Sequence, residues 1–433
     1  MSKKNNISVF WFRRDLRLED NVGLYHALKS GLPVIPIFIF DEDILSELPE
    51  NDARVTFIYQ SLHRIQSQLK KHNSSLLVKK GRVVEILHEL MANYTIKKMF
   101  FNKDYEPYAI MRDNEVIDLL NTHNIETCIY KDQVIFEKHD ILKADGKPYT
   151  VYTPYKNKWL SKLEPSHLRS TADLKPLFDN FHKYETLFPS METIGFVKSK
   201  QKVLAPNLNA ISEYHHTRDY PAVDGTSLVS PHLRFGTISI RKLAAIALKK
   251  NKTYLHELIW REFFMQILFH FPHVVTNNFK SAYNGIEWRD APDDFQQWCE
   301  GNTGYPLVDA GMRQLNQTGY MHNRVRMITA GFLCKHLLLD WRLGEAYFAE
   351  KLLDYELSSN NGNWQWAAGT GCDAAPYFRV FNPTIQLNKF DKELKYVKKW
   401  IPNAETDYCL PMVEHKFARQ RAIDTYKRGI LKQ

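Results

Sequence analysis

Residues 353–383, LDYELSSNNGNWQWAAGTGCDAAPYFRVFNP, combine acidic residues, paired asparagines, two tryptophans and an arginine around glycines. Trp364 and Trp366 cost free energy when exposed to water, whereas Asp354 and Glu356 are not buried without partners. A flat ligand with hydrogen-bonding edges would satisfy both kinds of side chain. The segment therefore predicts a ligand site in this half of the chain.

The composition predicts a soluble globular protein of two or three domains. The chain has 433 residues, of which 44% are hydrophobic and 25% charged, which is too long for one ordinary core. Its 58 Lys and Arg residues against 49 Asp and Glu residues give a net charge of +9. This balance favours a polyanionic partner such as nucleic acid, although an ordinary basic surface explains it equally well.

The cysteines and the apolar stretches predict a cytoplasmic protein with no membrane anchor. The five cysteines are widely spaced, without a C-x-x-C pair or matching histidine spacing, so neither a disulfide framework nor a zinc site is expected. The apolar run 327–334 ends at Lys335 and His336, far short of the roughly 20 residues that span a bilayer. The first residues have no apolar region typical of a signal peptide.

The N-terminal part predicts an α/β domain. Short apolar runs alternate with helix-like segments, and the clearest of these is 52–72, where apolar residues repeat every three or four positions. This alternation predicts a doubly wound parallel sheet. No G-x-G-x-x-G motif follows the first strand, so the dinucleotide-binding fingerprint is absent. The expected strands are 7–12, 33–40, 75–80, 97–102 and 125–130.

The remaining chain predicts a linker and then an all-α domain. Prolines punctuate a polar stretch from 132 to 206, which predicts an interdomain connection. We therefore expect an α/β domain over 1–131, a linker over 132–206 and a helical domain over 207–433. The best helix candidates are 240–249, 254–271, 306–318, 322–339 and 343–353.

Residues 225–231, GTSLVSP, form the first candidate motif. Small hydroxyl residues in a turn before a helix leave backbone N–H groups and hydroxyls available for phosphate oxygens. An ordinary turn and helix cap explains the same residues.

A second motif lies at 256–264, HELIWREFF. Glu257, Trp260 and Arg261 share one helix face. They could form hydrogen bonds with the edge of a base and stack on its flat face, or they could form a surface ion pair beside an aromatic ring.

A third motif, YMHNRVRM at 320–327, places Arg324 and Arg326 at the start of a helix. These arginines could contact phosphates, while a basic helix end is the ordinary explanation. Trp298, Trp341 and Trp364 are widely separated, and their positions alone favour three core residues.

Taken in order, the motifs resemble the photolyase/cryptochrome family, specifically class I cyclobutane pyrimidine dimer (CPD) photolyases. The resemblance covers nearly the whole chain. It is carried by WFRRDLRLEDN (11–21), GTSLVSP (225–231), ELIWREFF (257–264), GYPLVDAGMRQL (304–315), MHNRVRMITAGFL (321–333) and NNGNWQWAAGTGCDAAPYFRVFNP (360–383).

The resemblance implies a helical domain that holds FAD. Asn360 would reach the flavin N5, and Arg326 would pair with Asp354 beside the ring. The residues that match the family's FAD-binding positions are Tyr214, Thr226, Ser227, Leu228, Val229, Ser230, Arg261, Asn323, Arg326, Asp354, Tyr355, Glu356 and Asn360.

The implied reaction is light-driven repair of CPDs in DNA. Excited reduced FAD gives an electron to a flipped-out dimer, the cyclobutane ring opens and the electron returns. Trp298, Trp341 and Trp364 match the family's electron relay from the surface to the flavin, with Trp364 nearest the ring.

The resemblance also implies a DNA-binding surface. Glu257 would accept hydrogen bonds from the thymine edge, and Trp260 and Trp366 would form an apolar wedge against the dimer. Arg218, Arg324 and Arg379 would hold phosphates. The residues expected to contact DNA are Arg218, Glu257, Trp260, Arg261, Asn323, Arg324, Met327, Trp366 and Arg379.

The chain departs from the family pattern at four places. Leu228 replaces a basic residue of some relatives, Glu356 an aspartate and Tyr320 a tryptophan. Tyr108 and Ala109 stand where folate-using relatives carry a glutamate after the tyrosine–glutamate pair. A second antenna chromophore, folate or deazaflavin, is therefore left undetermined.

Two alternative functions remain at this point. A cryptochrome would signal as a blue-light photoreceptor, but the complete wedge and the short segment after Pro383 favour the enzyme. A (6-4) photolyase needs a histidine proton donor, whereas the pocket positions are Asn323 and Met327. We expect a monomeric CPD photolyase that acts on UV-damaged DNA.

Overall fold

The computed structural model describes residues 6–404 and 408–431. Within these ranges the chain forms two compact units, and each unit is assembled from segments distant in sequence. The first unit comprises the residues up to Glu137, Leu163–Ala205 and Leu228–Ile246. The second comprises Lys138–Lys162, Pro206–Ser227 and the residues from Ala247 onward.

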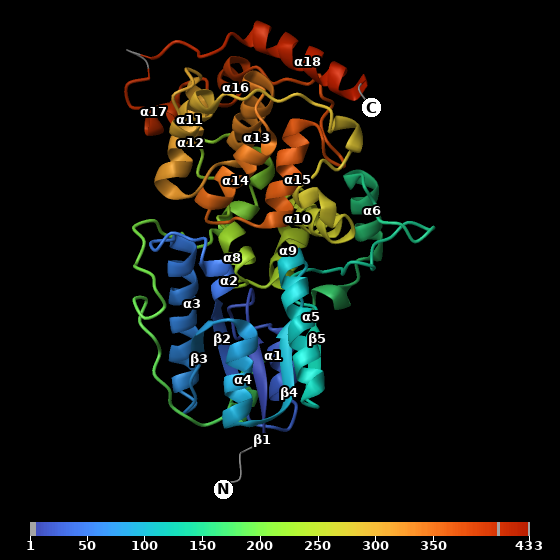
Figure 1. Ribbon diagram of the computed structural model, residues 1–433, viewed down its shortest axis with the longest axis vertical. Helices are drawn as coiled ribbons and strands as arrows, with labels where there is room; N and C mark the ends of the chain where they lie inside the picture. The colour runs from blue at the N-terminus through green and yellow to red at the C-terminus, as the bar shows by residue number, and fades with distance from the viewer. Residues whose placement is uncertain (1–5, 405–407, 432–433) are drawn as a thin grey trace. The chain divides into compact units, whose positions relative to one another are not determined.

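The first unit contains the predicted parallel sheet. Its strand order is β3-β2-β1-β4-β5 (Figure 1). Successive strands are therefore added on one side of β1 up to β3, and on the other side of β1 from β4 onward. Val9 of β1 pairs with Ile35 on one side and with Met99 on the other. The strands are β1 (Asn6–Phe12), β2 (Val34–Asp41), β3 (Leu77–Gly81), β4 (Thr95–Asn102) and β5 (Glu126–Tyr130), which confirms all five predicted positions to within a few residues.

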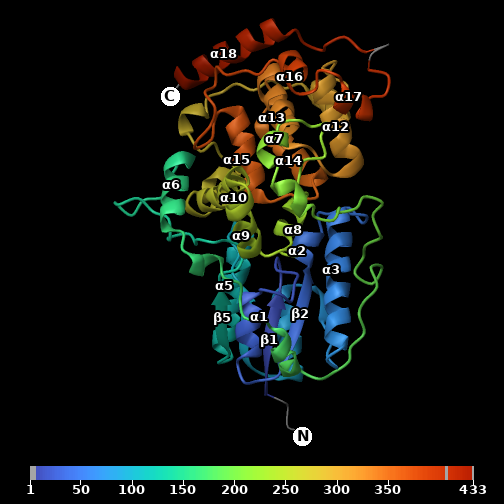
Figure 2. The same cartoon turned by 180° about the vertical axis from the view of Figure 1, so that it is seen from behind.

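Helices cover both faces of this sheet, because successive side chains of a buried strand point to opposite sides. Phe10 and Phe12 pack with residues of α1 and α3, whereas Val9 and Trp11 pack with residues of α4 and α5. Figure 2 shows helices of this unit beside the sheet. The helices and 3-10 turns of this unit are α1 (Val22–Leu28), α2 (Glu42–Leu45), α3 (Ala53–Lys70), α4 (Val83–Asn93), α5 (Pro107–Thr122), η1 (Pro165–Leu168), η2 (Lys175–Asn180) and α8 (Ser230–Arg234). A further helix, α9 (Ile240–Lys250), begins within it.

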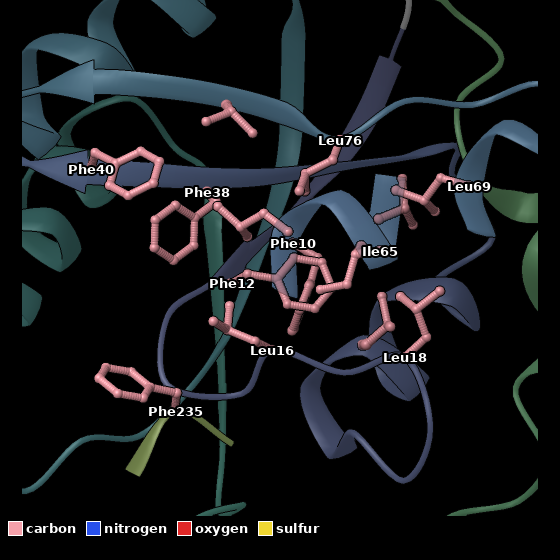
Figure 3. Packing of buried hydrophobic residues seen from close by; sticks show 14 of the residues in the cluster. Phe10, Phe12, Leu16, Leu18, Phe38, Phe40, Ile65, Leu69, Leu76 and Phe235 are labelled. Atoms are coloured by element: carbon pink, nitrogen blue, oxygen red, sulfur yellow. The ribbon is translucent and has the colours of Figure 1, made fainter. Parts of the chain in front are cut away.

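The segment 163–205 belongs to the core of the first unit. Phe178, Phe181, Met191 and Ile194 are buried in the same cluster as Phe10 and Phe38. Figure 3 shows this cluster, in which Phe235 also takes part. The structure thus divides the chain differently from the predicted linker at 132–206. Apolar residues scattered between prolines carry no period, so their burial could not be predicted.

The second unit is helical, as predicted. Its helices and short turns are α6 (Tyr152–Lys162), η3 (Leu208–Ile211), α7 (Tyr214–Thr217), α10 (Lys252–His270), η4 (Pro272–Val275), η5 (Ser281–Tyr283), α11 (Pro292–Glu300), α12 (Pro306–Thr318), α13 (Asn323–Gly331), η6 (Phe332–Leu337), α14 (Trp341–Lys351), α15 (Leu357–Ala368), α16 (Pro383–Phe390), α17 (Lys395–Trp400) and α18 (His415–Leu431).

The helix predicted over 322–339 is interrupted. α13 continues into η6, which has π-helical geometry, and ends at Leu338 with φ of +54°. A left-handed residue stops a helix, and periodicity cannot reveal it because Leu338 fits the apolar pattern. The helix predicted at 343–353 is α14, which starts earlier because Asp340 accepts a hydrogen bond from the Arg342 backbone N–H at 3.0 Å.

Close helix contacts position α15. A Cβ built on Gly362 would lie 2.1 Å from Phe264 of α10, and one built on Gly344 of α14 would lie 2.1 Å from Trp364. A larger residue at either position would push α15 away from its neighbours. Among the described residues, no helix is both long and apolar enough to cross a membrane.

We expect Phe181→Ala to lower the free energy of unfolding by about 3–5 kcal/mol, because it leaves a cavity in the first core. Leu187→Ala is the matched control, since Leu187 is 93% exposed and a surface change should cost less than about 0.5 kcal/mol. Chemical denaturation followed by circular dichroism measures both. Equal effects would contradict the assignment of this segment to the core.

Candidate functional site

Two arginine–carboxylate pairs lie around the start of α15. Arg326 Nη2 lies 2.9 Å from Asp354 Oδ2, which confirms the predicted pairing. Arg261 of α10 contacts Glu356 at 3.2 Å. Both carboxylates are largely buried, so each needs its guanidinium. The pairs bring together α10, α13 and α15.

Asn360 points its amide toward an acid that the sequence analysis missed. Its Nδ2 donates to the backbone carbonyl of Glu345 at 3.0 Å and to the Glu345 carboxylate at 2.9 Å. Burial raises the pKa of Glu345, while the Asn360 hydrogen bond lowers it. No local pattern in α14 singles out Glu345, because its partner is 15 residues away. The flavin N5 contact of Asn360 stays a prediction.

A chain of contacts runs from residue 227 to α10. The hydroxyls of Ser227 and Tyr254 lie 2.7 Å apart, and Tyr254 meets the edge of Tyr214. The Arg218 guanidinium lies 5.3 Å from the centre of the Tyr214 ring and 2.6 Å from Glu257 Oε1. The contact with Ser227 adds Tyr254 to the candidate site. The sequence had placed Tyr254 only at the start of a predicted helix.

The predicted phosphate motif is divided between the two units. Thr226 and Ser227 belong to the second unit, whereas Leu228, Val229 and Ser230 belong to the first. Leu228 has a φ of +54°, a backbone conformation that favours glycine. Val229 is buried and Ser230 begins α8. The contacts of these five residues with FAD stay predictions.

The pKa of Glu257 and the pKa of His322 are shifted in opposite directions. Burial raises the pKa of Glu257, and the neighbouring Arg218 lowers it. Burial together with Arg324 and Arg326 lowers the pKa of His322 to about 4. His322 Nδ1 accepts a hydrogen bond from the Arg324 backbone N–H at 3.1 Å. His322 is therefore a neutral helix cap at neutral pH, and a poor proton donor.

The predicted phosphate contacts of α13 lie at its start. Arg324 pairs with Asp219 at 2.5 Å and lies 4.5 Å from the centre of the Phe390 ring. Asn323 is exposed and Met327 is half-buried. Arg324 would have to exchange Asp219 for a DNA phosphate, whereas Asn323 is already accessible.

The predicted wedge residues are partly accessible. Trp260 is half-buried and stacks on Tyr152, with ring centroids 3.6 Å apart. Trp366 is also half-buried, and Arg379 is exposed. The wedge itself stays a prediction. Tyr152 was missed because it lies in the segment predicted as a linker.

The three predicted relay tryptophans share one hydrophobic cluster. Trp298 and Trp364 are in edge contact, with centroids 6.1 Å apart. However, Trp298 and Trp341 are fully buried and Trp364 is 2% exposed, so none of the three forms the surface end of a relay. Trp288 is half-buried and packs against the same cluster, and the backbone N–H of the next residue, Arg289, donates to Leu338, three residues before Trp341, which makes Trp288 a candidate for that end. The exposure of a tryptophan cannot be derived from its spacing.

The residues present fit FAD. The arginines suit a diphosphate, and the carboxylates and the amide suit the polar edges of an isoalloxazine ring. Glu356 and Asn360 are four residues apart and lie on one side of α15, so the edge of a single ring could meet both.

Comparison with known proteins agrees with this geometry. Residues 8–175 match the family model described as DNA photolyase, and residues 254–406 match the FAD binding domain of DNA photolyase. The deoxyribodipyrimidine photo-lyase of Escherichia coli is 35% identical over 97% of this chain and 98% of its own.

Two solved structures are also similar. A class III photolyase from Agrobacterium tumefaciens has a TM-score of 0.88 and 32% identity, over 100% of this chain and 99% of its own. A photolyase from Sulfolobus tokodaii, described with two FAD molecules, has a TM-score of 0.82 and 33% identity, over 98% and 100%.

We expect Arg261→Met to lower the free energy of unfolding by about 3–5 kcal/mol, because it deprives the buried Glu356 carboxylate of its guanidinium. Lys395→Met is the matched control, since the pair of Lys395 with Glu393 is exposed and should contribute nothing measurable. Denaturant titration of both variants measures the difference. A silent Arg261→Met would show that this pair does not stabilise the site.

Proposed function

Because this chain belongs to the photolyase/cryptochrome family, we propose that it is a deoxyribodipyrimidine photo-lyase that repairs CPDs in DNA with light. The observation that carries the proposal is the arrangement of α15. Its start lies beside two buried arginine–carboxylate pairs, Trp364 is buried among aromatic rings, and Trp366 is half-buried two residues later. One helix thus offers a cofactor face, an electron path and a substrate contact.

Residues of the predicted helical domain, 207–433, would hold FAD. Arg261 and Arg326 would face the diphosphate and the ring, while Asp354, Glu356 and Asn360 would face the polar edges of the isoalloxazine. The other proposed contacts are Tyr214, Thr226, Ser227, Leu228, Val229, Ser230, Asn323 and Tyr355. When bound and reduced, FAD supplies the light-excited electron that opens the cyclobutane ring and is then recovered.

Side chains around α10 would receive the dimer. Glu257 accepts hydrogen bonds from the thymine edge; its ion pair with Arg218 favours the charged form and opposes the burial that raises its pKa. Trp260 and Trp366 supply flat apolar contacts. Arg218, Arg324 and Arg379 neutralise phosphates beside the lesion, so affinity falls as salt rises. We propose that the enzyme acts as a cytoplasmic monomer.

The tryptophan cluster would supply electrons to oxidised flavin. Trp364 is the inner residue, Trp298 is in edge contact with it, and Trp341 lies in the same cluster. Aromatic rings in contact provide short steps for an electron, and we assign the surface end to Trp288.

His322 argues against the (6-4) alternative. This chemistry needs a protonated histidine close to the lesion. Here burial and two arginines lower the pKa of His322 to about 4, and the ring caps α13. Cryptochrome signalling has no comparable support in the described geometry. We keep class I as the proposed subclass, although the similar structures include a class III enzyme.

The direct test is a blue-light assay of the purified protein on an oligonucleotide with one thymine dimer. We expect dimer loss in light, none in darkness, and no loss of a (6-4) lesion. Glu257→Ala should weaken binding of the dimer by about 10- to 100-fold, because a hydrogen bond to a charged group contributes about 1.5–3 kcal/mol. Retained FAD absorption is the control. Clearance of (6-4) lesions alone would contradict CPD specificity.

Trp364→Phe should slow photoreduction of oxidised FAD at least tenfold and leave repair by chemically reduced enzyme intact. The reason is that phenylalanine keeps the packing but is far harder to oxidise. Transient absorption measures the first quantity, and the dimer assay measures the second. Trp400→Phe serves as the control, since Trp400 packs on the outside of the same cluster. Equal loss of both activities would exclude the relay role.

A further inference from the structure

The ring of Trp260 is held in a ladder of aromatic side chains. Tyr152 of α6 stacks on it at 3.6 Å with an interplanar angle of 9°. Phe264, one turn further along α10, lies 5.4 Å away at an angle of 29°. Phe263 meets Tyr152 and Trp260 edge-on. The indole plane is therefore set by its neighbours.

Two hydrogen bonds fix Tyr152. Its hydroxyl donates to the backbone carbonyl of His256 at 2.7 Å, and its backbone N–H donates to Asp373 Oδ2 at 3.1 Å. His256 precedes Trp260 by four residues, which is about one helical turn. The phenol ring thus spans one turn of α10 and lies flat over the indole. Tyr152 is buried, at 7% exposure.

The other end of the ladder packs closely against α15. A Cβ at Gly362 of α15 would lie 2.1 Å from the Phe264 ring, so the ring occupies the space that a larger side chain would need. Close packing of this kind transmits a displacement instead of absorbing it.

Both ends of the ladder therefore contact α15 or the segment that follows it. Phe264 rests on α15, and Asp373 lies in the segment that follows α15 and leads to Arg379. Trp366 is on the same helix. The orientation of Trp260 is thus coupled, through Tyr152, to the chain that carries the other proposed DNA contacts.

We propose that Tyr152 is a positioning residue for lesion recognition, which holds the Trp260 ring in the plane that receives the flipped dimer. The inference rests on the proposed function, in which Trp260 meets the dimer. An indole that is already immobile loses little rotamer entropy when the dimer binds. Tyr152 and Phe264 both stack on the indole, so the dimer must use the part of the ring that they leave open.

The test compares binding of two 20-base-pair duplexes, one with a central thymine dimer and one undamaged, by fluorescence anisotropy on the FAD-loaded protein. Tyr152→Leu should weaken dimer binding by about 3- to 10-fold, the equivalent of one aromatic contact. Binding of undamaged DNA and repair per absorbed photon at saturating DNA should stay unchanged. Tyr152→Phe keeps the stack and should restore most of the affinity.

Tyr149→Leu is the matched control on the neighbouring chain. Tyr149 meets Tyr155 at 6.4 Å between ring centroids, so its loss should not alter the ratio of damaged to undamaged binding. Asp373→Ala provides a second variant, which loosens the start of α6 and should lower the same ratio by a smaller factor.

The outcomes separate the inference from the proposed function. Wild-type protein that neither binds nor repairs the dimer overturns the proposed function and this inference with it. Wild-type protein that repairs while Tyr152→Leu keeps its binding ratio overturns the inference alone. If Tyr152→Leu loses FAD, the other two variants decide the question. An unchanged binding ratio in Asp373→Ala overturns the inference. A ratio in Tyr152→Phe that falls far below the wild-type value overturns it as well.

Discussion

The contact between Phe264 and Gly362 is the constraint on which the helical unit depends. Because glycine has no side chain, α10 and α15 approach until the phenylalanine ring occupies the space of a Cβ. This approach brings Arg261 of α10 within reach of Glu356 at the start of α15. Phe264, held by this contact, also forms one end of the aromatic ladder that contains Trp260. The same helix pair therefore positions both the proposed cofactor side and the proposed substrate side.

The polar interior of α15 follows from that approach. Asn361 and Gln365 donate to the backbone carbonyl of Val274 at 2.9 and 3.0 Å, so buried amides on one face are satisfied by the chain that follows α10. Glu356 and Asn360 lie on the opposite side of the helix. A helix that must satisfy protein on one face and a flavin on another needs amides, acids and tryptophans together, which explains why the segment is poor core material.

Regular elements were predictable, whereas contacts between distant segments were not. Buried strands and amphipathic helices such as α3 follow from apolar periodicity, and the pairing of Arg326 with Asp354 follows from charge and family resemblance. The burial of Phe181, the stacking of Tyr152 and the contact of Glu345 with Asn360 each depend on residues brought together by folding. The resemblance also assigned Trp298, Trp341 and Trp364 to a relay that begins at the surface, although all three rings are buried. Exposure is a property of the folded chain, so only the structure indicates Trp288.

In the proposed reaction, light moves an electron from bound flavin to a dimer held beside Trp260 and Glu257. The fluorescence lifetime of fully reduced FAD in the protein tests this step, with saturating dimer-containing DNA and with the same DNA undamaged. Because electron transfer competes with emission, we expect the dimer to shorten the lifetime and undamaged DNA to leave it unchanged. Identical lifetimes with both DNAs, under conditions where the dimer is bound, would contradict it.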